Sequence, residues 1–89
     1  MEYESGPSKA KANFRKHNVS FVDAAVALED PRALTMADPD ASGEQRFVSL
    51  GADPSGRVLV TVFTPRGRRT RIVSSRKASR NERRAYESQ

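Results

Sequence analysis

Arginine dominates the end of the chain, and its side chain is suited to binding phosphate. Nine of the 16 Lys and Arg residues fall between Arg66 and Arg84, where Glu82 is the single acid. Eight of these nine are arginines. Because a guanidinium group is a planar fork that binds phosphate bidentately, this composition indicates shaped recognition rather than a loose polycationic tail. The predicted partner is a nucleic acid.

Length and composition restrict what else the chain can be. Its 89 residues predict a single domain over residues 1–89, and 36% hydrophobic residues leave only a thin core. Cysteine is absent, which excludes disulfides and thiolate metal sites and makes a reducing cytoplasm the expected compartment. The longest apolar run, at 58–63, is far shorter than the roughly 20 residues of a membrane span. The acidic and polar first residues argue against a signal peptide, so no membrane partner is expected.

The arginines must be positioned by a small α+β domain. Ser8 is a candidate cap for a helix over residues 9–17, and Ser20 with Asp23 predicts a second helix over 21–28. Ser79 and Glu82 form a capping box ahead of a helix that runs to about residue 87. Strands are predicted at 33–36, 46–50, 57–64 and 69–75, with a tight hairpin at 65–67. The predicted architecture is an antiparallel four-stranded sheet with two short N-terminal helices and a C-terminal helix.

Strand alternation predicts which side chains of the last strand share a face. Alternation by two places Arg69, Arg71 and Ser75 on one face of the sheet. The same rule places Ile72, Ser74 and Arg76 on the other face.

Several blocks of sequence resemble the BrnT toxins of type II toxin–antitoxin systems. The blocks are K-H-N-V-S-F at 16–21, R-F-V-S-L-G at 46–51, R-V-L-V at 57–60, R-I-V-S-S-R-K-A-S at 71–79 and E-R-R-A-Y-E at 82–87. The first and fourth blocks are specific as a pair, and the resemblance extends over residues 3–87. Two segments depart from the family pattern. E-Y-E at 2–4 stands in for the usual E-W-D, and E-Q-R at 44–46 replaces the usual acidic pair before the arginine.

This resemblance implies a RelE-like fold and a ribonuclease that inhibits translation by cutting mRNA, with or without the ribosome. It also implies a BrnA-like ribbon-helix-helix antitoxin as partner. Operator DNA is expected to be bound only through the complex of toxin and antitoxin. No cofactor and no metal are expected, because cleavage is expected to proceed by attack of the ribose 2′-hydroxyl.

Cleaving RNA without a metal needs a base for the 2′-hydroxyl proton, cations that stabilise the phosphorane, and an acid for the leaving oxygen. Arginine stays protonated and can fill only the second role. Arg76 and Arg80 lie where the last strand ends and the last helix begins, so they are predicted to stabilise the transition state. Further phosphate contacts are predicted for Arg46, Arg69, Arg71, Lys77, Arg83 and Arg84. The alternative is a solvated basic face that binds nucleic acid or an acidic antitoxin without catalysis.

Glu44 and Tyr86 are the candidates for proton transfer. Glu44 precedes a strand, and it is either a base, a partner that orients Arg46, or a solvent-exposed carboxylate. Tyr86 lies three residues after Arg83, and it is either catalytic or a packing residue that anchors the last helix.

Two other groups carry less weight. His17 shares a predicted helix face with Ala10 and Phe14, where a packing role is favoured over catalysis. The acids at 38, 40 and 44 have a loose D-x-D-x-x-x-E spacing, but they lack the glycine of a calcium-binding loop. A metal site is therefore not favoured.

Overall fold

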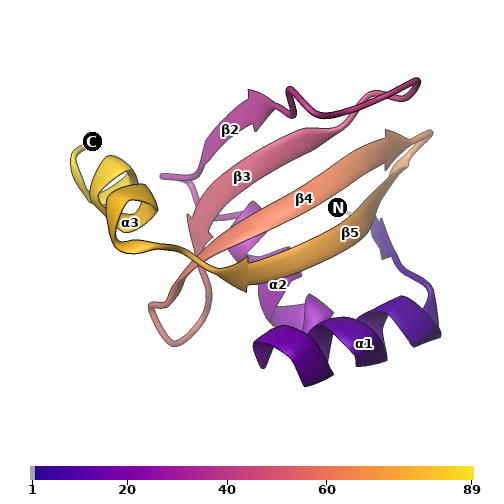
Figure 1. The fold of residues 1–89 in the computed structure, drawn as a ribbon, viewed down its shortest axis with the longest axis horizontal. Coiled ribbons are helices and arrows are strands. Elements are labelled where there is room, and N and C mark those ends of the chain that lie inside the picture. The colour runs from indigo at the N-terminus through magenta and orange to yellow at the C-terminus, as the bar shows by residue number, and fades with distance from the viewer. Residues whose placement is uncertain (1) are drawn as a thin grey trace.

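A computed structural model describes residues 2–89, which form three helices and one five-stranded sheet (Figure 1). The spatial order of the strands is β1-β5-β4-β3-β2, and all neighbours are antiparallel except β1 and β5, which are parallel. The predicted α+β class agrees with this arrangement. None of the helices within residues 2–89 is long and apolar enough to span a bilayer. The elements are β1 (Glu2–Glu4), α1 (Pro7–His17), α2 (Phe21–Leu28), β2 (Leu34–Ala37), β3 (Phe47–Ala52), β4 (Val58–Arg66), β5 (Arg69–Lys77) and α3 (Arg80–Glu87).

The predicted four-stranded antiparallel sheet is wrong in detail, because β1 adds a short parallel strand at one edge. Tyr3 lies opposite Thr70 in the β1–β5 pairing, so a strand of three residues joins the start of the chain to β5. Glu4 places a carboxylate oxygen 3.7 Å from a guanidinium nitrogen of Arg69 and the other oxygen 3.7 Å from Arg71. Three residues are too few for an alternating pattern to show in the sequence, so this strand could not be recognised from periodicity.

The first helix begins two residues earlier than predicted. Pro7 occupies the first turn of α1, a position that suits a residue without a backbone N–H. Gly6 is the N-cap and no side chain caps this end, so the predicted cap at Ser8 is wrong. The predicted caps of the other two helices are confirmed. Ser20 Oγ accepts from the Asp23 backbone N–H at 3.0 Å, and the capping box at the start of α3 is complete.

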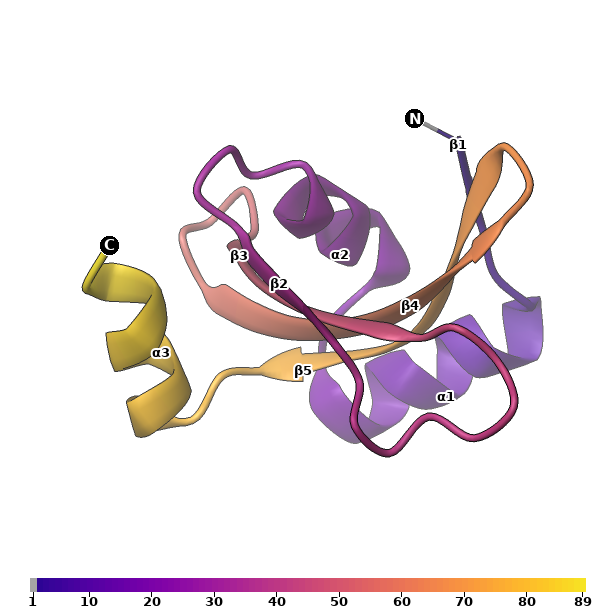
Figure 2. The same cartoon turned by 90° about the horizontal axis from the view of Figure 1, so that it is seen from above.

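Helix α1 lies along the edge of β5 that short β1 leaves unpaired (Figures 1 and 2). There the side chain of Asn13, which is 7% exposed, forms hydrogen bonds with backbone groups that a neighbouring strand would otherwise bind. Its Oδ1 accepts from the Ser75 N–H at 3.0 Å, and its Nδ2 donates to the Ser75 carbonyl at 2.9 Å and to the Val19 carbonyl at 3.0 Å. The side chain thus satisfies backbone groups that would otherwise be open to pairing with another chain.

Helix α2 covers one face of the sheet and buries most of the core (Figure 2). Phe21 and Ala24 pack against Ile72 of β5, while Ala27 packs against Leu59 of β4. The approach of α2 to β3 is close enough to require glycine. A Cβ atom on Gly51 would lie 2.2 Å from the Ala27 carbonyl oxygen.

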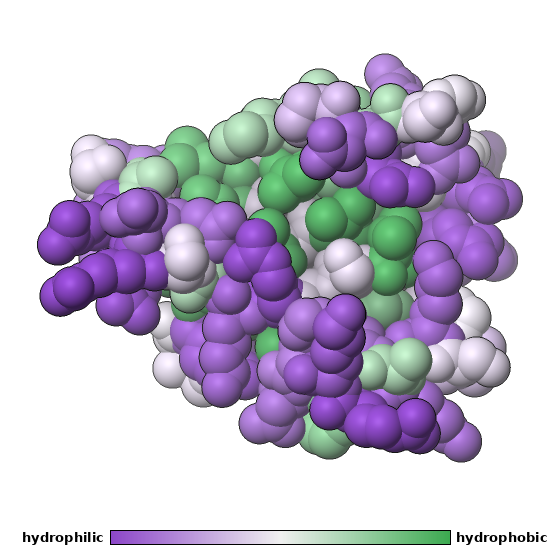
Figure 3. Space-filling model, in the orientation of Figure 1, coloured by the Kyte–Doolittle hydropathy of each residue, from purple (hydrophilic) through white to green (hydrophobic). Residues whose placement is uncertain are grey.

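The other face of the sheet carries Val48, Val60 and Val62, and we call it the open face. Helix α3 covers one end of it, where Tyr86 and the loop before α3 pack against a cluster that includes Val60. At the other end, Thr64 is buried and donates to the Gln45 carbonyl of the loop before β3. In Figure 3, which shows this face, hydrophobic residues form its centre and hydrophilic residues surround them. The open face is therefore the broad surface of the sheet that remains accessible to a ligand.

Candidate nucleic-acid interface

A β-bulge in β5 decides which arginines reach the open face. The pairing between β4 and β5 shifts register between Val62 and Phe63, which leaves Val73 as an extra residue in β5. An extra residue reverses the face on which every later side chain of the strand lies, compared with simple alternation.

The bulge places Arg76 on the same face of the sheet as Arg69 and Arg71. Arg76 lies opposite Val60, and Arg71 lies opposite Thr64, which is four residues further along the same strand. The predicted alternation is therefore wrong for the residues after the bulge, because Ser74 and Arg76 join the open face and Ser75 joins the covered face. The buried hydrogen bond between the hydroxyls of Ser75 and Thr61, at 2.9 Å, lies on the covered face.

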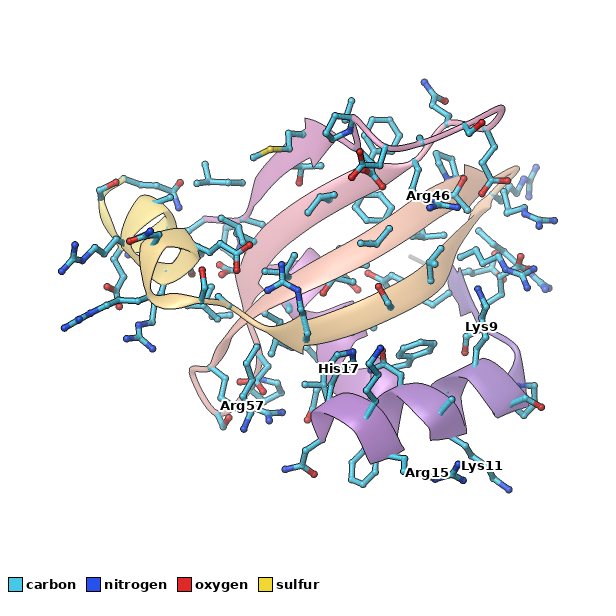
Figure 4. All side chains as sticks on the ribbon, viewed as in Figure 1. Lys9, Lys11, Arg15, His17, Arg46 and Arg57 are labelled. Atoms are coloured by element: carbon cyan, nitrogen blue, oxygen red, sulfur yellow. The ribbon has the colours of Figure 1, made fainter. Side chains whose placement is uncertain are left out.

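Arginines thus stand at both ends of the open face, and valines form its floor. Arg46 lies beside the far end of β4, toward the loop of residues 38–45 (Figure 4). Arg71 belongs to the same end, and Arg76 lies at the end nearest α3. The residues of β4 opposite Arg71 and Arg76 are four positions apart, which corresponds to about 13 Å along the strand.

Arg76 is held in a bidentate ion pair with Glu82. Nη1 and Nη2 of Arg76 donate to the two carboxylate oxygens of Glu82, each at 2.9 Å. The hydrogen bond raises the pKa of Arg76 and lowers the pKa of Glu82 to about 2. Arg76 is therefore well oriented, but a phosphate must compete with Glu82 for it.

Arg46 is only weakly paired. Its Nη2 lies 4.0 Å from Glu44 Oε1, and its Nε is buried without a hydrogen-bond partner among residues 2–89. A buried donor without a partner costs about 1–3 kcal/mol. A phosphate cannot reach this buried atom, but the Arg46 side chain is 35% exposed and its Nη2 has only Glu44 nearby, at 4.0 Å, so the terminal nitrogens can bind an anion.

The predicted base, Glu44, lies in the loop before β3 and is exposed to solvent. Its distance of 4.0 Å from Arg46 places a carboxylate and a cation side by side at one end of the open face. Two further arginines near this end, Arg69 and Arg71, are paired with the N-terminal strand. Arg69 lies 4.0 Å from Glu2, and both Arg69 and Arg71 are close to Glu4.

The predicted proton donor Tyr86 is engaged elsewhere. It packs against the cluster of Leu50 and Val60, and its hydroxyl donates to Asp30 Oδ2. This hydrogen bond raises the pKa of Tyr86 and, against the opposing effect of burial, lowers the pKa of Asp30. The Arg32 guanidinium lies 5.9 Å from the centre of the Tyr86 ring. These contacts anchor α3, and a catalytic role for Tyr86 stays a prediction.

The remaining predicted phosphate ligands lie around α3. Arg80, Arg83 and Arg84 are exposed, and none of their side chains has a hydrogen bond or ion pair within residues 2–89. Lys77 lies opposite Leu59 and so belongs to the other face of the sheet from Arg76. It lines a small cleft of about 230 Å³ together with Arg83 and Arg57.

Arg57 belongs to the same region, although no role in the site was predicted for it from the sequence. Its Nε donates to Asp53 Oδ2 at 2.7 Å, and its Nη1 donates to the Asn18 carbonyl at 3.1 Å (Figure 4). The signal for this pairing was available, since an acid at the start of a turn and an arginine at its end often pair across it. Arg57 ties the β3–β4 turn to the end of α1.

His17 and the acidic residues give no alternative centre. His17 is half-buried at the end of α1 and lines a shallow hollow beside Val73 and Ser74, and its imidazole has no hydrogen bond within residues 2–89 (Figure 4). Phe14, which was predicted to pack on the same helix face, is 52% exposed, and Asn13 is the buried residue of α1. In residues 2–89, no three His, Cys, Asp or Glu side chains lie close enough together to hold a metal ion.

Comparisons with known proteins agree with the fold described above. A family model described as the ribonuclease toxin BrnT of type II toxin–antitoxin systems matches residues 6–82. The fold is similar to that of the 1.1 Å crystal structure of the Brucella abortus ribonuclease toxin BrnT, with a TM-score of 0.67. The two chains are 22% identical, and the match covers 90% of this chain and 99% of the other. Comparison with curated proteins gives no significant match.

Proposed function

Because the chain belongs to the BrnT family of ribonuclease toxins of type II toxin–antitoxin systems, we propose that it cleaves RNA on the open face of its sheet. One observation carries the choice of site: Arg46, Arg71 and Arg76 converge on the face that α2 does not cover. The family also implies a cognate antitoxin that neutralises the chain.

The RNA backbone runs along β4, with phosphates bound at both ends of the open face. The arginines near the two ends supply the charge, and half-buried Val48 and Val62 contact the sugars and bases between them. The stacked pair Phe47 and Phe63, with ring centres 5.6 Å apart, lies on the covered face. Base stacking on phenylalanine therefore contributes little to RNA recognition on the open face.

Cleavage takes place at the end where Glu44 and Arg46 meet. Glu44 accepts the proton of the ribose 2′-hydroxyl, and the 2′-oxygen attacks the adjacent phosphorus. Arg46 and Arg71 stabilise the negative charge that builds up on the phosphorane oxygens. The bond to the 5′-oxygen breaks, the 5′-oxygen takes up a proton, and a 2′,3′-cyclic phosphate remains. The 4.0 Å between Glu44 and Arg46 supports this pairing of roles.

Arg76 and Arg80 bind the RNA at the other end and set its register. Arg76 exchanges Glu82 for a phosphate, and exposed Arg80 adds charge at the start of α3. Lys77, Arg83 and Arg84 extend the basic surface to the flanking nucleotides. The alternative is that Arg76 and Arg80 stabilise the transition state, as the sequence predicts. Kinetics of single variants distinguish this role from RNA binding.

Several finer properties belong to the same proposal. Cleavage needs no metal ion, the reaction inhibits translation by cutting mRNA, and the chain acts in the cytoplasm. The antitoxin is of the ribbon-helix-helix type and connects the complex to operator DNA. The resemblance of the sequence blocks to the family supports these properties.

The test is incubation of the purified chain, freed of antitoxin, with end-labelled RNA in excess EDTA, with and without ribosomes. Fragments that end in 2′,3′-cyclic phosphate are the expected result, and Glu44→Gln is expected to abolish them. RNA that stays intact in both arms contradicts the proposal. RNA that is bound but not cut in either arm supports the second candidate, a non-catalytic nucleic-acid-binding module. One observation favours this second candidate: Arg69, Arg71 and Arg76 already form ion pairs with acidic residues of the same chain.

A further inference from the structure

Hydrophobic side chains are exposed on the helical side of the molecule, away from the open face. Val22 is 76% exposed, Phe14 52% and Val26 44%. Val22 and Val26 are four residues apart on α2 and so form one stripe, and Phe14 of α1 lies next to this stripe across a shared hollow. None of the three is needed for the RNA contacts proposed above.

These side chains border a continuous groove. A hollow of about 660 Å³ lies between α1 and the start of α2, and it is lined by Phe14, Phe21 and Val22. A second hollow of about 380 Å³ shares Phe21 and Val22 with the first and continues to Val26. A third hollow, which shares Val26 with the second, continues to the end of α2. We call these three hollows together the helix groove.

The two ends of the helix groove carry opposite charge. Lys11 and Arg15 line the end at α1, and neither has an ion-pair partner within residues 2–89 (Figure 4). Glu29, which also accepts from the Tyr3 hydroxyl at 2.8 Å, lines the other two hollows and carries the acidic end. Asp30 lines the last hollow, but its carboxylate already accepts from Tyr86 and from two backbone N–H groups. An apolar stripe with a basic end and an acidic end fits an amphipathic helix of the opposite polarity.

We infer that the helix groove is the docking site for an amphipathic helix of the cognate antitoxin. The docked helix has acidic residues over Lys11 and Arg15, aliphatic or aromatic residues over Val22 and Val26, and a basic residue near Glu29. The inference rests on the proposed function, because only a type II toxin has such a protein partner. A patch with three large exposed hydrophobic residues on a small basic domain is the kind of surface that a tight protein partner covers.

An antitoxin helix docked in the helix groove does not cover the open face. The inference therefore predicts that antitoxin binding and RNA cleavage are separable by mutation. A variant of the groove should lose the antitoxin and keep its activity on RNA. A variant of the open face should keep at least the contact in the groove.

The experiment is isothermal titration calorimetry of the cognate antitoxin against wild type, Val22→Glu and Met36→Glu. Val22 is largely exposed in the first turn of α2, where an acidic residue is favourable, so Val22→Glu is expected to fold. We expect its affinity for the antitoxin to fall about 100-fold, as for a buried interface residue. Met36→Glu is the matched control, because Met36 is 55% exposed on β2 and lies outside the groove. Its affinity is expected to change less than about 3-fold.

The charge pattern has its own test. The double substitution Lys11→Glu with Arg15→Glu is expected to lower the affinity for the antitoxin about 10-fold or more, with a larger effect at low salt. Cleavage of end-labelled RNA by the free variants should match wild type. Unchanged antitoxin affinity of Val22→Glu overturns the inference. A free chain that is a dimer, and that Val22→Glu turns into a monomer, also overturns it, since the groove would then hold a second copy.

Failure of the inference can be told apart from failure of the proposed function. If wild type binds the antitoxin and both groove variants bind it equally well, the inference fails and the proposed function stands. If wild type binds no antitoxin, the inference fails together with the assignment of that partner. RNA cleavage by the free chain then shows whether the catalytic part of the proposed function survives.

Discussion

Glu82 binds both terminal nitrogens of Arg76, and through this ion pair it joins β5 to α3. The same carboxylate accepts the Ser79 backbone N–H at 2.8 Å and so completes the cap of α3. One side chain thus caps a helix and orients a cation of the open face.

The Arg76–Glu82 pair predicts a pH-dependent contribution to stability. The pKa of Glu82 is lowered to about 2 from 4.5, so its stabilising effect is complete above about pH 5 and is lost as the pH falls toward 2. Glu82→Gln is expected to lower the free energy of unfolding by about 1 kcal/mol at pH 7, after allowance for solvent screening. The difference should shrink as the pH falls, and thermal denaturation between pH 7 and 2 measures it. A difference that does not change with pH would contradict this assignment.

Arg46 is expected to be the arginine on which the chemical step depends most. Arg46→Ala removes a preorganised donor at the phosphate, which should lower kcat for RNA cleavage about 100-fold or more. Arg66→Ala is the matched control, since Arg66 is an exposed arginine at the β4–β5 hairpin. Single-turnover cleavage of end-labelled RNA measures both. Equal effects of the two substitutions would mean that Arg46 contributes only general charge.

Arg76 is expected to act on RNA binding rather than on the chemical step. Arg76→Ala should raise KM about 10-fold and change kcat much less than Arg46→Ala does. It also leaves Glu82 without its partner, so Arg76→Lys, which keeps the charge, is the control. A fall in kcat as large as that of Arg46→Ala would move the scissile phosphate to the α3 end of the open face.

Asn13 is expected to be one of the most important polar residues for stability. Asn13→Ala leaves the N–H and carbonyl of Ser75 and the carbonyl of Val19 without their partner, all in a buried setting. The expected loss is about 3 kcal/mol, since each unsatisfied buried group costs about 1–3 kcal/mol. Asn81→Ala, on the exposed side of α3, is the matched control and should cost less than about 0.5 kcal/mol. Urea denaturation at pH 7 measures both losses of unfolding free energy. Similar losses would show that the hydrogen bonds of Asn13 at the edge of β5 contribute little to stability.

Tyr86→Phe separates packing from catalysis. The substitution keeps the ring on the cluster of Leu50 and Val60 and removes only the hydrogen bond to Asp30. We expect a loss of about 1 kcal/mol in the free energy of unfolding. RNA cleavage by the folded variant should stay within about 3-fold of wild type, well short of the roughly 10²–10⁴-fold that a general acid contributes. A loss of that larger size, in a variant that is still folded, would restore the catalytic role predicted for Tyr86.

The features that could be predicted from sequence are those that depend on neighbouring residues. The capping box of Ser79 and Glu82, the cap at Ser20 and the hairpin near Gly67 are decided within a few positions of the chain, and all three are present. The sequence motifs also sufficed for the family, because the blocks at 16–21 and 71–79 are specific as a pair.

The features that could not be predicted depend on pairing across the fold. The strand of β1 is fixed by contacts with Arg69 and Arg71, far along the chain, and it has no periodicity of its own. The bulge at Val73 follows from the register against β4, so simple alternation put Arg76 on the wrong face. The cluster of arginines was visible in the sequence, but which arginines act together depends on this one extra residue.

The pairing of β1 with β5 also constrains when the chain can complete its fold during synthesis. Residues 2–4 are synthesised before their strand partners at 69–71, which follow 67 residues later in the sequence. Both early helices must likewise wait, since α1 packs on β5 and α2 packs on β3, β4 and β5. The arginines of the open face therefore come together only after β5 has been synthesised.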